Sequence, residues 1–68
     1  MAEINKRVGI NIRKMREKKS LSQEKLAFEA SLHRAYIGQI ERAEKNIGLK
    51  NLEIIAKALN VNISELLK

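Results

Sequence analysis

Residues 21–42, LSQEKLAFEASLHRAYIGQIER, have the pattern of two short helices joined by a tight turn. Ser22 is placed to cap the first helix, because a serine hydroxyl accepts a backbone N–H of the first helical turn. One apolar face of that helix is predicted by residues at helical spacing: Leu26, Ala27 and Ala30. Ser31 marks the break, and the second helix is expected from about residue 33 to residue 43.

The second of these helices has two different faces. Ile37 and Ile40 form an apolar stripe that continues to Glu44. The opposite face is predicted to hold two guanidinium groups, one carboxamide and two very small residues: Arg34, Ala35, Gly38, Gln39 and Arg42. In the major groove of DNA, arginine pairs with guanine and glutamine with adenine through two hydrogen bonds each. This face is therefore predicted to recognise DNA, and the alternative is an ordinary solvated helix surface.

The composition favours an all-α protein with one domain spanning residues 1–68. The chain has 68 residues, no Pro, no Cys and three Gly, with abundant Leu, Ile, Ala, Lys and Glu. Five helices are expected: residues 3–19, the two helices already described, residues 49–59, and a short final helix. No apolar run is long enough to cross a membrane and no signal peptide is visible, so a cytoplasmic protein is expected.

Catalysis is not expected from this sequence. It contains no paired carboxylates, no Cys/His set and no phosphate-cradling glycine loop. The single histidine, His33, has no partner with which to bind a metal, so neither a metal nor a cofactor is predicted. His33 instead falls at the position that caps the second helix of the pair.

The net charge of +6 suits a polyanionic partner, but it is unevenly distributed along the chain. Residues 1–20 carry +5, residues 21–48 are neutral, and residues 49–68 carry +1. The predicted recognition unit is thus locally neutral, so charge alone is a weak argument for DNA binding. The basic first helix lacks the Trp or Phe that favours binding at a membrane surface.

The other helices have readable limits and faces. The first carries an apolar stripe, Ile4, Val8, Ile12 and Met15, and is expected to end at Ser20. The fourth carries another, Leu49, Leu52, Ile55, Ala56 and Leu59. Asn60 suits the left-handed conformation that follows many helices. Asn62 and Glu65 have the spacing of a capping box that would open the final helix.

The last third of the chain is unusually rich in apolar residues. Two interpretations of this cluster are open: a two-fold homodimer interface, which we favour for part of it, or packing entirely within one chain. The residues concerned are Ile47, Leu49, Val61, Ile63, Leu66 and Leu67. Phe28 lies off the apolar face of its helix and is expected either at the edge of the core or partly exposed.

The sequence resembles the helix-turn-helix repressors of the phage lambda and 434 repressor and Cro type, in the bacterial group called XRE-like. The resemblance covers residues 8–67 and is carried by residues 12–16 (IRKMR), 21–27 (LSQEKLA), 36–42 (YIGQIER) and 52–59 (LEIIAKAL). Within that group, LHRAYIGQIER and AEKNIGLKNLEIIAKAL look most like the controller proteins of restriction–modification systems. The resemblance implies five helices, a homodimer and a palindromic operator, with RNA polymerase as a possible further partner.

The resemblance also implies roles by matched position. Base contacts would come from Arg34, Ala35 and Gln39, with Tyr36 flanking the groove. Contacts to the DNA backbone would come from Gln23, Lys45 and Asn46, together with Ser22, His33 and Arg42 at or near the helix ends. Arg16 and Glu41 match a structural ion pair between the first and third helices.

This chain departs from the family pattern at three of its turns. The family often has glycine where this chain has Ser20, Ser31 and Ala43. At Ser31 the family turn needs a positive φ, so either the serine accepts roughly 1 kcal/mol of strain or the turn differs.

A rival function is that of a protein-interaction module of the antitoxin type, built on the same fold.

Overall fold

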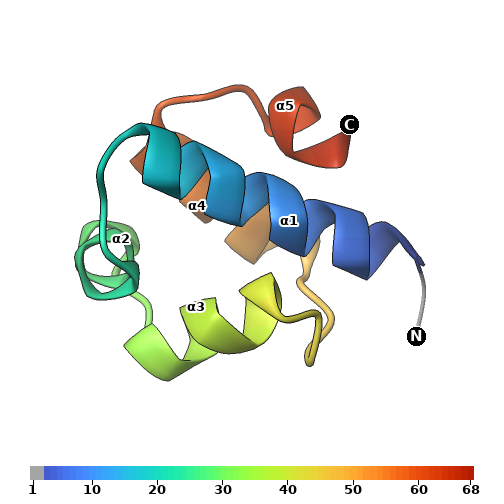
Figure 1. Cartoon of the computed structure of the whole chain (residues 1–68), viewed down its shortest axis with the longest axis horizontal. Coiled ribbons are helices and arrows are strands. Elements are labelled where there is room, and N and C mark those ends of the chain that lie inside the picture. Colours follow the sequence, from blue (N-terminus) through green and yellow to red (C-terminus); the bar gives the residue numbers. More distant parts are fainter. Residues whose placement is uncertain (1–2) are drawn as a thin grey trace.

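The computed structural model describes residues 3–68, which form five α-helices and no strands within that range (Figure 1). The helices are α1 (Glu3–Lys18), α2 (Gln23–Ala30), α3 (Arg34–Glu41), α4 (Leu49–Leu59) and α5 (Ile63–Leu67). The all-α architecture predicted from the sequence is confirmed. The third helix is shorter than predicted at both ends, because His33 caps it and the chain leaves the helical conformation at Ala43.

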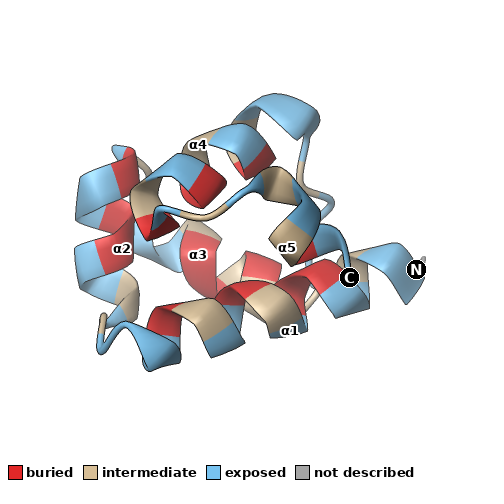
Figure 2. Ribbon diagram, turned by 90° about the horizontal axis from the view of Figure 1, so that it is seen from above, coloured by how far each residue is buried: buried red, intermediate tan, exposed pale blue. Residues whose placement is uncertain are grey.

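The core is built from the inward faces of all five helices (Figure 2). Its members are aliphatic and at most 3% exposed: Val8, Ile12, Leu26, Ala27, Ile37, Ile40, Leu52, Ile55, Ala56, Leu59 and Leu66. In Figure 1, α3 lies on one side of α1 and α5 lies on the other. The surface of α3 that faces away from α1 is therefore at the edge of the molecule.

Four helices end on a residue in the left-handed conformation, and none of these residues is glycine. Ser20, Ser31, Ala43 and Asn60 have φ between 56° and 59°. In each case the next residue donates its N–H to the carbonyl five positions back, as in Leu32 N to Ala27 O at 2.9 Å. This bond is the mark of a Schellman end and satisfies a helix carbonyl that would otherwise lack a partner. Of the two alternatives for Ser31, the structure has the strained one.

We expect Ser31→Gly to stabilise the protein. The left-handed conformation costs a residue with a Cβ about 1–2 kcal/mol, and glycine returns about 0.4–1 kcal/mol of this through a more flexible unfolded chain. The net gain should be about 0.5–1 kcal/mol in urea unfolding followed by circular dichroism. Asn60→Gly is the matched control and should gain less, since asparagine already tolerates this conformation. Equal gains at both sites would contradict the strain argument.

Three predictions about local structure were wrong. Ile4 is 40% exposed, because the N-terminal end of α1 extends beyond the helices it packs against (Figures 1 and 2). Leu49 is 76% exposed and so does not belong to the buried face of α4, which begins at Leu52; its exposure is compatible with the interface that the sequence also predicts for it. Asn62 precedes α5 but its side chain makes no capping hydrogen bond, so the predicted capping box is not formed.

Candidate nucleic-acid interface

The helix pair α2–α3 is fixed by a capping contact at the start of each helix. The Ser22 hydroxyl accepts the backbone N–H of Lys25 at 2.9 Å, as predicted. His33 caps α3 through Nδ1, which accepts the N–H of Ala35 at 3.3 Å. Between the two helices, Ser31 makes the left-handed turn that sets their relative direction.

Glu44, predicted to continue the inner stripe, lies beyond α3 and is exposed. Within α3 itself the two faces are oriented as the sequence predicts, with one exception. Ile37 and Ile40 are buried in the core, whereas Arg34 and Ala35 are exposed and Gln39 is half-buried. The exception is Gly38, which is buried rather than part of an open surface. A Cβ at this position would lie 3.0 Å from Nη1 of Arg42 and 3.6 Å from Oε1 of Gln23. Gly38 therefore lets two side chains pass close over α3, and it is not itself a contact surface.

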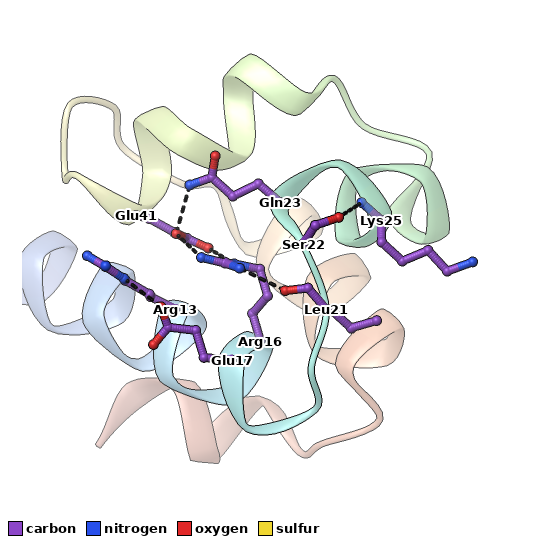
Figure 3. Close-up of polar contacts among 8 residues, drawn as sticks. All are labelled: Arg13, Arg16, Glu17, Leu21, Ser22, Gln23, Lys25 and Glu41. Carbon is purple, nitrogen blue, oxygen red and sulfur yellow. Dashed lines mark hydrogen bonds and ion pairs between the residues drawn. The ribbon is translucent and has the colours of Figure 1, made fainter.

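Beneath this face a polar network joins three segments of the chain (Figure 3). Arg16 on α1 and Glu41 on α3 form the expected ion pair, with Nε to Oε2 at 2.7 Å and Nη2 to Oε1 at 3.1 Å. Nη1 of Arg16 also donates to the carbonyl of Leu21 at 2.8 Å. The hydrogen bond to Glu41 raises the pKa of Arg16, against the opposing effect of burial. The pair holds the C-terminal end of α3 against α1.

Gln23 takes part in the same network. Its Nε2 donates to Oε1 of Glu41 at 3.0 Å, which ties the start of α2 to the end of α3. Its amide oxygen does not take part in that bond and lies near Gly38. Gln23 therefore positions α2 on α3, and whether it also contacts a phosphate stays a prediction.

Of the other predicted contacts to the DNA backbone, two already have side-chain partners. Arg42 forms a bidentate ion pair with Glu44, with Nε to Oε2 at 2.8 Å and Nη2 to Oε1 at 3.1 Å. The hydrogen bond between them raises the pKa of Arg42 and lowers the pKa of Glu44. Asn46 accepts a hydrogen bond from Asn5 of α1, a contact that sequence reasoning missed because 41 residues separate the two.

Two cations of the predicted interface have no anionic partner. Within residues 3–68, Arg34 and Lys45 make no ion pair. Both are exposed, Arg34 at the start of α3 and Lys45 in the turn that follows it. They are therefore available to bind an anion or a base edge without breaking an existing contact.

Tyr36 differs from its neighbours on α3. It is half-buried and packs against the core, and its hydroxyl accepts a hydrogen bond from Nδ2 of Asn51 on α4 at 2.9 Å. Asn51 was not predicted to belong to the site. No periodicity or motif marks it, because the contact joins two different helices, at positions 15 residues apart in the chain.

The apolar cluster in the last third of the chain is only partly a surface. Leu66 is 0% exposed and belongs to the core, so the prediction that it lies in a dimer interface was wrong. The reason is that α5 turns this side chain inward toward α1, where Asn11 also donates to the Leu66 carbonyl. Among the rest, Leu49 and Leu67 are exposed, and Ile47, Val61 and Ile63 are half-buried. A groove of about 440 Å³ is lined by Leu49, Lys50, Glu53, Ala56, Lys57, Val61 and Ile63.

Two short helices with a left-handed turn, and a second helix with a polar outer face, define a helix-turn-helix protein. The chain belongs to the helix-turn-helix family, whose model matches residues 12–66. Members of this family regulate transcription by binding DNA and are not enzymes, and this chain is accordingly a DNA-binding regulator. No helix within residues 3–68 combines the length and apolar character needed to cross a bilayer.

The relatives of this chain include controller proteins of restriction–modification systems, which confirms the resemblance found in the sequence. Control protein C.BamHI of Bacillus amyloliquefaciens is 53% identical over 60 residues, which cover 87% of this chain and 74% of that protein. Control protein C.SmaI of Serratia marcescens is 46% identical over 65 residues, covering 96% and 77%. The crystal structure of the controller protein C.AhdI from Aeromonas hydrophila matches with a TM-score of 0.89 and 40% identity, covering 91% and 94%.

Proposed function

We propose that this protein is the controller of a restriction–modification system and binds a palindromic operator as a homodimer. The observation that carries the proposal is the outer face of α3, where Arg34 and Ala35 are exposed beside a half-buried Gln39. The similarity to the control proteins C.BamHI and C.SmaI, at 53% and 46% identity, supports the choice of regulated system. On this proposal, residues 1–68 act as a single domain; residues 1 and 2 lie outside the part that the structure describes.

The mechanism divides contacts into two kinds. Lys45, Gln23 and the N-terminal ends of α2 and α3 hold phosphates and set the position of the protein on the duplex. Arg34 and Gln39 then form hydrogen bonds with base edges in the major groove. A two-fold dimer would place the two copies of α3 roughly 34 Å apart, one turn of DNA, so that both half-sites are contacted from one side. The bound dimer blocks RNA polymerase or recruits it.

The groove beside α4 supports the dimer. Exposed Leu49 lines it together with Val61 and Ile63, and a contiguous apolar surface of this kind suits a buried interface better than a single exposed side chain does. Sedimentation at micromolar concentration should give twice the chain mass. Leu49→Lys should shift the protein toward the monomer, while Phe28→Lys, an equally exposed site on α2, should not. A wild-type protein that remains a monomer at that concentration would contradict the two-fold arrangement.

We expect Arg34→Ala to weaken operator binding by about 1–3 kcal/mol and to leave binding to random DNA almost unchanged. The reason is that a bidentate contact to a base is lost while the phosphate contacts remain. The matched control is Lys45→Ala, which should weaken binding to both duplexes alike. Mobility shifts at fixed salt measure both. Equal losses on operator and random DNA for Arg34→Ala would show that it contacts only the backbone.

Removing the partner of Arg42 should strengthen DNA binding. In Glu44→Gln the Arg42 guanidinium no longer has a carboxylate partner and can neutralise a phosphate instead. Affinity should rise on operator and random DNA, and the slope of log K against log salt should steepen by about 0.9 for one further phosphate. The control is Glu65→Gln, which makes the same charge change on α5, where Glu65 pairs with Lys68. Because α5 lies on the other side of α1 from α3, this variant should leave the slope of log K against log salt unchanged. An unchanged slope for Glu44→Gln would argue against Arg42 as a backbone contact.

Selection from random DNA tests the proposal as a whole, because it gives both the site sequence and the spacing of half-sites. A palindrome with half-sites one helical turn apart is expected. A salt-dependent mobility shift by the protein alone separates this function from that of an antitoxin-like module, which needs a protein partner.

A further inference from the structure

The hydrogen bond between Asn51 and Tyr36 has a direction, and the direction matters. Nδ2 of Asn51 donates and the phenolic oxygen of Tyr36 accepts, at 2.9 Å. A phenolic hydroxyl has one proton to donate and oxygen lone pairs that accept. Because Asn51 uses the oxygen as an acceptor, the hydroxyl proton is left for a different partner.

The surroundings of Tyr36 indicate where such a partner would lie. Tyr36 is in the first turn of α3, directly after the exposed Arg34 and Ala35. Its ring packs against the core, so the side chain is held in place rather than rotating in solvent. An acceptor that approaches the start of α3 from outside can therefore receive the proton of a hydroxyl whose other side is already bound.

We propose that Asn51 is a positioning residue for sequence recognition, which holds the Tyr36 hydroxyl as a hydrogen-bond donor toward a base acceptor in the operator. The inference rests on the proposed function, because it requires the start of α3 to enter the major groove. Acceptors of suitable chemistry there are N7 and O6 of guanine and O4 of thymine. Asn51 itself touches no DNA; it acts from α4 through the tyrosine.

Reversing the polarity of residue 51 tests this directly. Asn51→Asp replaces the donor by a carboxylate that only accepts. The Tyr36 hydroxyl then donates its proton to that carboxylate and can no longer donate it to a base. We expect about a tenfold loss of affinity for the selected operator beyond any loss on random DNA. Tyr36→Phe should cause a similar operator-specific loss, since it removes the same donor. Circular dichroism checks that both variants keep the helical content of the wild type.

The added negative charge of Asn51→Asp would by itself weaken DNA binding, and a double-mutant cycle removes this effect. In the Tyr36→Phe background the charge penalty remains but there is no hydroxyl to redirect. Asn51→Asp should then cost the operator no more than it costs random DNA. An operator-specific loss that persists in the Tyr36→Phe background would overturn the proposal, and so would equal losses on both duplexes from Tyr36→Phe, the result expected of a phosphate contact.

A measurement without DNA separates the failure of this inference from the failure of the proposed function. In the ¹⁵N-labelled free protein, Tyr36→Phe should shift the side-chain NH₂ signals of Asn51 and leave those of Asn60 and Asn62 in place. An Asn51 signal that does not move would overturn the inference alone. Suppose instead that Arg34→Ala weakens binding to operator and random DNA equally. The proposed base recognition by α3 would then be refuted, and this inference with it, even if the Asn51 signal moves.

Discussion

Glu41→Ala should cost about 3–5 kcal/mol of stability and leave much of the protein unfolded at room temperature. The side chains of Arg16 and Glu41 are only 11% and 3% exposed. Without the carboxylate, the Arg16 guanidinium keeps its desolvation penalty and loses its counter-charge, and Gln23 loses its partner as well. A chain of 68 residues has a modest core, so it has little stability in reserve. Urea unfolding followed by circular dichroism measures the loss.

The chain provides a matched control for this prediction. Arg42 and Glu44 form a bidentate pair with nearly the same distances, 2.8 and 3.1 Å, but their side chains are 59% and 52% exposed. Glu44→Ala should therefore change stability very little, because water already screens that pair. The double variant Arg16→Met with Glu41→Met should be more stable than either single variant, since no buried charge is left without a partner. Equal losses for Glu41→Ala and Glu44→Ala would contradict the role of burial.

Gly9→Ala should destabilise the protein by about 2–3 kcal/mol, even though alanine is favoured in a helix by about 1 kcal/mol. A Cβ on Gly9 would lie 2.5 Å from the carbonyl oxygen of Ile40 and 2.9 Å from that of Glu41. Both neighbours are backbone atoms at the end of α3, so no side-chain rotation relieves the contact. The added methyl would push α3 away from α1 and shift the helix that carries Arg34 and Gln39.

Two other glycines provide controls with graded contacts. At Gly38 the nearest atom to an added Cβ is the guanidinium of Arg42 at 3.0 Å, the flexible end of a side chain that can move. At Gly48, before α4, nothing lies within 4 Å. The cost of alanine should therefore be much larger at Gly9 than at Gly38 or Gly48, as measured by the midpoint of urea unfolding. A loss at Gly48 as large as that at Gly9 would show that helix packing is not the cause.

The sequence by itself determined the helices, the turn between α2 and α3, and the family. These depend on features within a few residues of one another: the spacing of Ile37 and Ile40, the cap at Ser22, and the break at Ser31. A left-handed turn at Ser31 was one of two alternatives, and it came from the resemblance to proteins that often have glycine there. The resemblance also paired Arg16 with Glu41 across 25 residues, which periodicity alone does not do.

The tertiary structure alone decided which side chains are open to a partner and which are held by the protein itself. Burial depends on the surfaces that neighbouring helices cover. Leu66 is therefore in the core and Leu49 is on the surface, while Gly38 is covered by the side chains of Gln23 and Arg42. Partners on different helices, such as Asn51 and Tyr36, meet only in the folded protein. A helical wheel describes one helix in isolation, and these properties belong to pairs of helices in contact.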